Sequence, residues 1–172
     1  MKASVFVGTS LDGFIARVNG ELDFLPQDAE SHGYEEFIAS IDALVMGRNT
    51  FETVLGFGGA WPFEKPVFVL STRPLATVPA GAGVERLSGE PAEIVTHLAA
   101  RGIDHIYVDG GITIQRFLNA GLIQRIIVTR VPVLIGSGIP LFGPLAQDIR
   151  LRHVVTRPYA SGLVQSEYEV AG

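Results

Sequence analysis

Cysteine is absent from the 172 residues of this chain. Its absence excludes a disulfide framework, thiolate metal ligands and a thiol nucleophile. The four histidines, at positions 32, 97, 105 and 153, also lack the H-x-x-x-H spacing with which two rings on one helix hold a metal. We therefore expect neither cysteine chemistry nor a metal centre.

Charged side chains are scarce. They make up 18% of the chain, against roughly 25% in typical soluble domains, and the formal net charge is -5. A duplex nucleic-acid binder needs a basic face to displace counterions, so we expect no nucleic-acid partner. A surface with few charges exposes more apolar area than one small domain tolerates, which favours a homodimer over a well-filled monomer.

Long hydrophobic runs are missing as well. No run reaches the roughly 18 apolar residues that a membrane-spanning helix needs. The short apolar stretch over residues 1–7 soon meets Gly8 and Asp12, whereas a signal peptide needs a longer stretch and a small-residue cleavage site. We expect a cytoplasmic protein without a membrane partner.

Short β-branched runs alternate with helical patterns along the chain. The expected strands cover residues 4–7, 43–46, 67–70, 105–108, 125–131, 151–156 and 163–170. The alternation up to about residue 131 indicates parallel strands joined by helices, and the turn-rich link 157–162 indicates an antiparallel hairpin. The sequence predicts one α/β domain over residues 1–172, with a mostly parallel central sheet and an antiparallel C-terminal edge strand.

Four helices are expected between these strands. The first covers residues 34–41, whose apolar positions have the spacing of one buried helix face. In the second, Asn49 is expected to cap the helix start together with Glu52, three residues later. The third covers residues 91–101, and the fourth runs from about residue 113 to residue 120.

Two expected strands run through glycine into a helix. Residues 43–50 read A-L-V-M-G-R-N-T, and residues 106–113 read I-Y-V-D-G-G-I-T. Glycine lets the backbone approach a ligand, and the free N–H groups of a helix start attract phosphate; a tight turn also favours glycine for steric reasons alone. The spacing does not match the G-x-G-x-x-G fingerprint. The pair of turns predicts a site for the two halves of a pyrophosphate.

A third strand end carries hydroxyl groups and a guanidinium group. The strand over residues 67–70 is followed by Ser71, Thr72 and Arg73. A guanidinium group binds phosphate through two hydrogen bonds, so this strand end suits the 2′-phosphate of NADP, although a single arginine is otherwise a solvated surface charge. The three strand ends together favour a dinucleotide lying along one edge of the sheet.

These motifs resemble the dihydrofolate reductase-like superfamily. Residues 45–52, V-M-G-R-N-T-F-E, are similar to the segment after the second strand of dihydrofolate reductases, residues 69–72 to their next cofactor strand, and residues 108–111 to their paired-glycine turn. Residues 9–16, T-S-L-D-G-F-I-A, and residues 134–142, L-I-G-S-G-I-P-L-F, look more like the reductase domain of riboflavin biosynthesis, the C-terminal part of a deaminase–reductase. The resemblance covers essentially the whole length. It implies a three-layer α/β fold and NADPH as the cofactor.

The resemblance also implies where the cofactor binds. The nicotinamide falls near Thr9, Leu11 and Ile15, the pyrophosphate between residues 47–50 and 110–113, and the 2′-phosphate at residues 71–73. The implied cofactor-binding residues are Thr9, Leu11, Ile15, Gly47, Arg48, Asn49, Thr50, Leu70, Ser71, Thr72, Arg73, Gly110, Gly111, Ile112 and Thr113.

Three aspartates are candidates for the substrate side. Asp109 stands where riboflavin-type reductases carry an acid that faces the substrate, so it is the first catalytic and substrate-binding candidate. Asp28 lies in a segment like that of the pterin-orienting carboxylate of dihydrofolate reductases; its alternative role is to cap the following helix. Asp12 is a further substrate-binding candidate, with hydrogen bonds to its own loop as the alternative. Where the family carries an arginine for a ribosyl phosphate, this chain has Ser31 or His32.

The residues and the resemblance together predict an NADPH-dependent reductase. It would transfer hydride to a pyrimidine- or pterin-like heterocycle, in the manner of 5-amino-6-(5-phosphoribosylamino)uracil reductase. Such a reaction needs the nicotinamide C4 atom within about 3–3.5 Å of the accepting carbon, and a proton donor. The alternatives are a true dihydrofolate reductase and a catalytically silent NADP-binding module. The expected partners are a small heterocyclic substrate and a second copy of the chain.

Overall fold

The computed structural model describes residues 1–26 and 32–172. The candidate residues Asp28 and Ser31 therefore lie outside the described part of the chain. In chain order the elements are β1 (Lys2–Ser10), β2 (Phe14–Ala16), α1 (Tyr34–Ser40), β3 (Ala43–Gly47), α2 (Arg48–Gly56), β4 (Val67–Leu70), β5 (Val84–Leu87), α3 (Pro91–Ala100), β6 (His105–Asp109), α4 (Gly111–Asn119), β7 (Arg125–Val131), β8 (Ile139–Pro140), β9 (Leu151–Pro158) and β10 (Val164–Val170).

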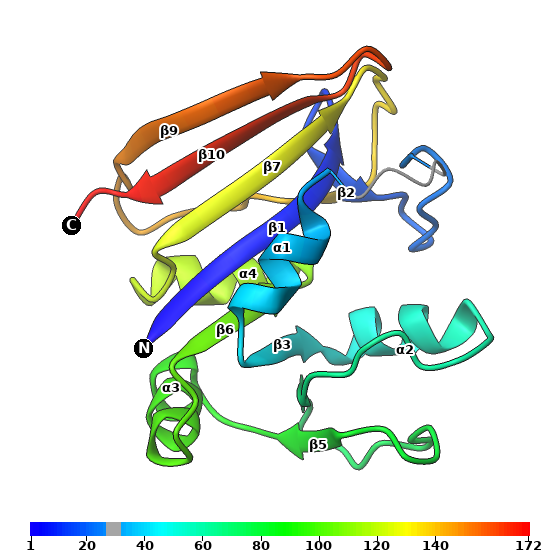
Figure 1. Ribbon diagram of the computed structural model, residues 1–172, viewed down its shortest axis with the longest axis vertical. Helices are drawn as coiled ribbons and strands as arrows, with labels where there is room; N and C mark the ends of the chain where they lie inside the picture. Colours follow the sequence, from blue (N-terminus) through cyan, green and yellow to red (C-terminus); the bar gives the residue numbers. More distant parts are fainter. Residues whose placement is uncertain (27–31) are drawn as a thin grey trace.

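Eight strands form one sheet in the order β5-β4-β3-β6-β1-β7-β10-β9 (Figure 1). Every pair from β5 to β7 is parallel. The C-terminal strand β10 runs antiparallel to both β7 and β9. The predicted mixture of a parallel centre and an antiparallel C-terminal edge is confirmed. Two short strands, β2 and β8, pair separately.

Helices cover both faces of the sheet. On one face α1 and α2 pack Phe37 and Phe51 into one hydrophobic cluster, and on the other face α3 and α4 pack Leu98 and Phe117 into a second. Successive strand residues point to opposite faces, so Val45 of β3 joins the second cluster while its neighbours join the first. The predicted three-layer α/β architecture is therefore confirmed.

The parallel strands bring their carboxyl ends to one edge of the sheet, on the right in Figure 1. Helices α2 and α4 begin there, each directly after a strand. In open α/β sheets, ligands bind outside the carboxyl ends of the strands. This edge is where the three predicted strand-end motifs meet.

Two predicted helix starts are wrong by two residues. Helix α2 begins at Arg48, so Asn49 lies inside its first turn and does not cap it, and Glu52 pairs instead with Arg48 across one helical turn at 3.0 Å. Helix α4 begins at Gly111 and not near Thr113. Both strands pass into a helix through a glycine that offers no side-chain cap, so the capping pattern does not mark the start.

Strand β5 is an element that the sequence does not predict. It is four residues long and pairs only with β4 among the described strands. Its two central residues, Glu85 and Arg86, are exposed and charged, so the strand does not appear as an apolar run in the sequence.

Across the described residues, the helices are all too short or too polar to span a membrane.

Candidate active site

The two glycine turns lie against each other. Strands β3 and β6 are parallel neighbours, with Met46 in register with Asp109 just before the turns. A Cβ atom added to Gly110 would lie 2.5 Å from Oγ1 of Thr50, and one added to Gly47 would lie 2.8 Å from Oγ1 of Thr113. Each turn thus leaves no room for a side chain because the other turn fills the space. The sequence-based expectation that the turns adjoin is met.

Two helix N-termini open at this point. Helices α2 and α4 have nine residues each, and neither N-cap, Gly47 or Gly110, offers a side-chain hydrogen bond to the first turn. The first N–H groups of a helix have no partner within the helix, and the helix dipole adds positive potential. Two such ends side by side have the N–H donors with which an anion of two charged groups could be held.

The strand end after β4 is organised by Arg48. Its guanidinium group donates to Oγ of Ser71 at 2.6 Å and to the carbonyl oxygens of Arg73 and Pro74 at 3.2 and 3.1 Å. The Ser71 hydroxyl is further bonded to the backbone of Arg73. Arg48 and Ser71 therefore shape this loop from within, and the exposed side chain of Arg73 is left to meet solvent or a ligand.

Arg86 of β5 joins the same strand end, which the sequence analysis missed. Its guanidinium group donates to the carbonyl oxygen of Ser71 at 3.0 Å. It also borders a cavity of about 460 Å³ beside the start of α3. The residues lining this cavity are Arg86, Leu87, Ser88, Glu93, Ile94 and His97. Two arginines, at positions 73 and 86, thus flank the third strand end.

Asp109 occupies the end of β6 beneath helix α1. One of its carboxylate oxygens accepts the N–H of Gly110 at 2.9 Å, and the other has no hydrogen-bond partner among the described residues. Burial raises the pKa of Asp109 to about 6, and the bond from Gly110 opposes this only in part. A carboxyl group with this pKa can give or take a proton near neutral pH.

Tyr34, the first residue of α1, lies close enough to Asp109 to respond to its charge. Its ring packs edge-on against Phe6 of β1, with 5.6 Å between the ring centroids. Burial and then the charge of Asp109 raise the pKa of Tyr34 to about 12. Tyr107, two residues before Asp109, is buried and donates its hydroxyl to the carbonyl oxygen of Phe6 at 2.9 Å. Tyr34 therefore stays a neutral hydrogen-bond donor beside this carboxyl group.

The residues predicted near the nicotinamide are spread along the β1–β2 segment. Ile15 lies against the second glycine turn, because a Cβ atom on Gly111 would be 3.1 Å from its Cδ1 atom. Thr9 is buried, and its hydroxyl oxygen has no hydrogen-bond partner within the described residues. Leu11 is 53% exposed. Ile15 therefore packs against the second glycine turn, Thr9 is buried, and Leu11 lies at the surface.

Asp12 joins two loops. Its carboxylate accepts the backbone N–H groups of Ile135 and Gly136 at 3.3 and 2.8 Å. A hydrogen bond from Ser10 and these backbone bonds lower the pKa of Asp12. The carboxylate thus ties the β1–β2 loop to the segment after β7, whereas the alternative considered from the sequence placed its bonds within its own loop. Of the two candidate aspartates that the structure describes, Asp109 is the one at the glycine turns.

The remaining predicted cofactor residues differ in exposure. Thr113 is buried against Gly47, whereas Asn49, Thr72 and Ile112 are exposed. Leu70 ends β4 and is partly buried. His32 contributes its carbonyl oxygen to a hydrogen bond from Gln165 of β10.

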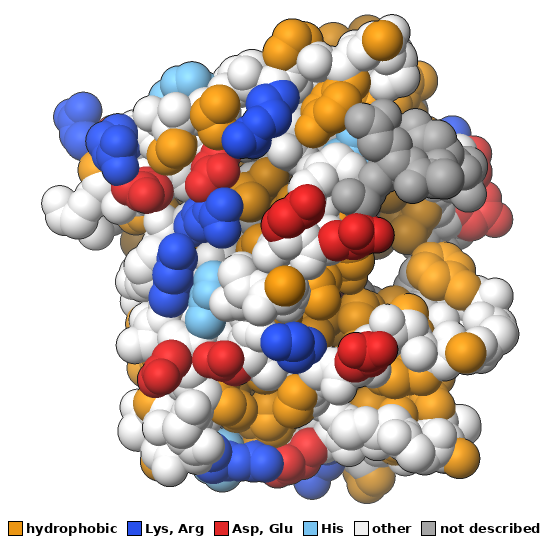
Figure 2. All heavy atoms as spheres, viewed as in Figure 1, with side chains coloured by type: hydrophobic (Ala, Val, Ile, Leu, Met, Phe, Trp, Pro, Cys, Tyr) orange, Lys and Arg blue, Asp and Glu red, His pale blue; other side chains and the backbone are white. Residues whose placement is uncertain are grey.

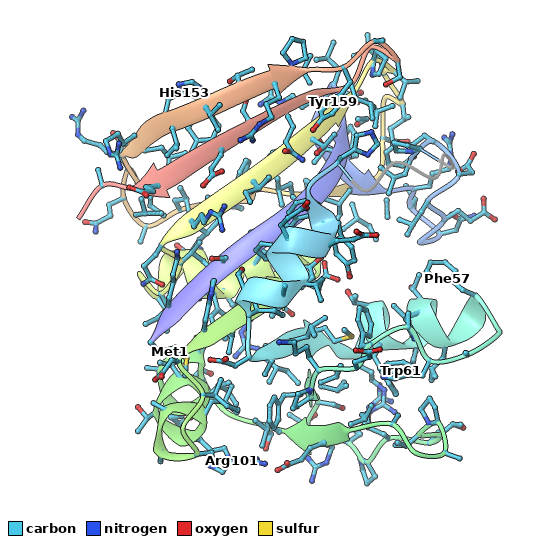
Figure 3. All side chains as sticks on the ribbon, in the orientation of Figure 1. Met1, Phe57, Trp61, Arg101, His153 and Tyr159 are labelled. Atoms are coloured by element: carbon cyan, nitrogen blue, oxygen red, sulfur yellow. The ribbon has the colours of Figure 1, made fainter. Side chains whose placement is uncertain are left out.

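A hollow opens between α1 and α2 on the face shown in Figure 2. Hydrophobic side chains line it, and acidic side chains lie beside it on α1, whose first turn carries the exposed Glu35 and Glu36. Phe57 follows α2, is 65% exposed and stands at the rim of the hollow (Figures 2 and 3).

Within the described residues, no three acidic, histidine or cysteine side chains lie together in a group that could hold a metal ion.

Comparisons with known proteins identify the family of this chain. The family model of the RibD C-terminal domain matches residues 2–165. A crystal structure of a putative riboflavin biosynthesis protein from Shewanella sp. PV-4 is 38% identical, with a TM-score of 0.91 and complete coverage of both chains. The uncharacterized protein YwjB of Bacillus subtilis is 29% identical over 171 residues, which are 97% of each chain.

A more distant structure shares the fold. Dihydrofolate reductase from Enterococcus faecalis, complexed with NADP(H), is 16% identical, with a TM-score of 0.68 over 99% of this chain and 97% of that one. The resemblance based on the motifs is thereby confirmed. This chain belongs to the RibD C-terminal domain family, a riboflavin-pathway reductase family with the dihydrofolate reductase-like fold.

Proposed function

We propose that the protein is an NADPH-dependent reductase that transfers hydride to a pyrimidine- or pterin-like heterocycle, a reaction of the 5-amino-6-(5-phosphoribosylamino)uracil reductase type. The observation that carries the proposal is the contact between the two uncapped helix starts at Gly47 and Gly110. Two helix N-termini packed against each other through glycine direct N–H groups at one place, which suits a pyrophosphate. A turn with a purely structural role does not need this arrangement.

The chain's residues fit the rest of such a cofactor. The pyrophosphate would lie between residues 47–50 and 110–113, with the nicotinamide end toward Thr9 and Ile15. Arg86, whose guanidinium group donates to the carbonyl oxygen of Ser71, and the exposed Arg73 would hold the 2′-phosphate at that strand end. The 460 Å³ cavity beside Arg86 offers space for the adenosine end.

In the proposed reaction the cofactor supplies the hydride, and the protein supplies position and a proton. The raised pKa of about 6 leaves a minor fraction of Asp109 protonated near neutral pH, and its second oxygen has no partner among the described residues. It would pass this proton to the nitrogen or oxygen of the bond being reduced. The neighbouring apolar side chains would keep water from the reacting atoms.

The direct test is the melting temperature with and without nucleotide. A ligand at 100 times its Kd stabilises a protein by about 2.7 kcal/mol, which is roughly 5–10 °C for a domain of this size. We expect such a shift with NADPH and a smaller one with NADH. No shift at millimolar NADPH would refute the proposal. A shift without oxidation of NADPH by any heterocyclic imine, flavin or carbonyl would instead support a silent binding module.

The choice of NADPH over NADH is expected to depend on Arg86. In an Arg86→Ala variant the affinity for NADPH should fall roughly 10- to 100-fold, since a charge-assisted hydrogen bond contributes about 1.5–3 kcal/mol, while the affinity for NADH should not change. Arg101→Ala is the matched control, because Arg101 pairs with Glu85 of the same strand at 2.8 Å but does not reach Ser71. Titration calorimetry with both nucleotides measures the difference, and equal losses for the two would contradict the assignment.

We also propose a cytoplasmic homodimer that pairs through β9. Its residues are exposed at every position except Val155, including the apolar Leu151 and Val154. A long edge strand with apolar side chains is a surface for pairing with another strand, and a second copy can supply it.

Light scattering after size-exclusion chromatography tests the dimer. The wild-type protein should have about twice the 18.4 kDa mass of one chain. A Val154→Lys substitution should shift it to the monomer, because a charge in the middle of an edge strand opposes pairing. A wild-type protein that is monomeric at micromolar concentration would contradict this interface.

A further inference from the structure

The two short strands β2 and β8 pack on the start of α4. They pair with each other apart from the main sheet, and we call this pair (residues 14–16 and 139–140) the β2–β8 ribbon. A Cβ atom added to Gly111, the first residue of α4, would lie 3.1 Å from Cδ1 of Ile15 and 3.3 Å from Cγ2 of Ile139. Both strands of the ribbon therefore form a wall beside the second glycine turn.

The loops that lead into the two strands are joined by Asp12. This residue lies just before β2, and its carboxylate accepts the backbone N–H groups of Ile135 and Gly136, shortly before β8, at 3.3 and 2.8 Å. Beside it, the N–H of Leu11 donates to the carbonyl oxygen of Val133 at 2.8 Å. Because each carboxylate oxygen accepts one of these N–H groups, the contact fixes the two loops, and with them the ribbon, relative to each other.

A second tether holds the same stretch of chain away from the ribbon. After β8 the chain reaches the end of α4, where the side-chain amide of Asn119 donates to the carbonyl oxygen of Pro144 and accepts the N–H of Ala146, both at 3.1 Å. Asn119 is the last residue of α4, eight positions after Gly111, which is about 12 Å along a helix. The chain after β7 is thus held at the ribbon by Asp12 and at the far end of the helix by Asn119.

These contacts lead to one inference, which rests on the proposed function. We propose that Asp12 is a positioning residue for the nicotinamide half of the cofactor. By joining the two loops it keeps the ribbon against the first turn of α4, and the ribbon sets the space between Ile15 and the open N–H groups of that helix. The adenosine half would lie after β4 and β5, which are separated from β6 by β3, so its site does not depend on this contact.

The whole cofactor and its adenosine half are the two probes. Adenosine 2′,5′-bisphosphate keeps the adenosine, the 2′-phosphate and one phosphate of the pyrophosphate, and it lacks the nicotinamide half. In an Asp12→Ala variant, titration calorimetry should show a Kd for NADPH about tenfold above the wild-type value. This change corresponds to about 1.4 kcal/mol, near the lower end of what hydrogen bonds to a charged group contribute. The Kd for the bisphosphate should stay within about twofold of the wild-type value.

Two further variants separate positioning from a general loss of structure. Asn119→Ala releases the same stretch of chain at the other tether, so it should lower the melting temperature as Asp12→Ala does but leave the Kd values of both probes unchanged. Asp12→Asn keeps one oxygen acceptor for the two N–H groups, so its Kd for NADPH should lie between those of Asp12→Ala and the wild type. Asp12→Asn also decides the question if Asp12→Ala does not fold, with an expected rise of about threefold.

Three results would overturn the inference and leave the reductase proposal intact. They are an unchanged Kd for NADPH in the Asp12 variants, an equal weakening of both probes in Asp12→Ala, and an equal loss of NADPH affinity in Asn119→Ala. Failure of the wild-type protein to bind NADPH is a different result, because it refutes the proposed function itself.

Discussion

An Asp109→Asn variant is expected to be more stable than the wild-type protein above pH 6 and to lose nearly all turnover. The amide oxygen can still accept the N–H of Gly110, but the amide carries no proton that it can transfer. A general acid contributes about 10²–10⁴ in rate, so kcat should fall by this factor while the Kd for NADPH stays the same. Single-turnover oxidation of NADPH measures the loss.

The gain in stability follows from the raised pKa. The folded pKa of about 6 exceeds the ordinary value of 3.8, so ionisation of Asp109 destabilises the folded state. Its favourable contribution is complete below about pH 4, is lost as the pH rises to about 6, and stays lost above that value. At pH 8 the variant should therefore exceed the wild type by up to about 3 kcal/mol in the free energy of unfolding, with no difference near pH 3.5. Urea unfolding at both pH values tests this.

Asp42→Asn is the matched control, with the opposite sign. The Asp42 carboxylate accepts the backbone N–H groups of Asp104 and His105, both at 2.9 Å, and these bonds lower its pKa. Its contribution is therefore present above the ordinary pKa and lost as the pH falls, so this variant should be less stable than the wild type at pH 7. If both variants shift stability in the same direction at pH 8, the environment assigned to Asp109 is wrong.

A Gly110→Ala variant is expected to lose NADPH binding at least a hundredfold. Gly110 has a φ of 98°, and the new Cβ atom would lie 2.5 Å from Oγ1 of Thr50. The methyl group collides with the Thr50 side chain on the first turn of α2, so we expect the start of α2 to move away from the start of α4, which separates the two groups of N–H donors. The backbone strain alone should destabilise the fold by about 1–3 kcal/mol. Calorimetric titration with NADPH gives the affinity.

Gly102→Ala separates strain from the clash. Gly102 also has a positive φ, 80°, but a Cβ atom there meets nothing within 4 Å. This variant should lower the melting temperature by a similar amount and bind NADPH like the wild type. If Gly110→Ala binds NADPH as tightly as Gly102→Ala does, the contact between the turns has no part in cofactor binding.

The ends of β3 and β6 could be predicted from the sequence, because an apolar strand pattern followed by glycine involves only residues next to each other in the chain. Residues 43–46 and 106–108 are apolar runs, the first followed by Gly47 and the second by Asp109 and Gly110, and the parallel order of their strands follows from the intervening helices. Because β3 and β6 are parallel neighbours, with Met46 opposite Asp109, Gly47 and Gly110 lie next to each other. The helix starts were harder to predict, because Arg48 and not Asn49 begins α2 and no side chain caps it.

The contacts between distant segments could not be predicted in this way. Arg86 reaches Ser71 only because the charged strand β5 pairs with β4. Tyr34 comes near Asp109 only because α1 packs across the sheet through Phe6. The bonds from Asp12 to the segment after β7 span more than 120 positions of the chain. No local pattern marks such partners, since each depends on how two elements meet in space.

The most direct test of the account is a crystal structure of the protein with NADPH bound. The pyrophosphate is predicted to accept hydrogen bonds from backbone N–H groups of both residues 47–50 and residues 110–113, with the nicotinamide on the Asp109 side. A cofactor bound elsewhere, or held by only one of the two helix starts, would contradict the central claim.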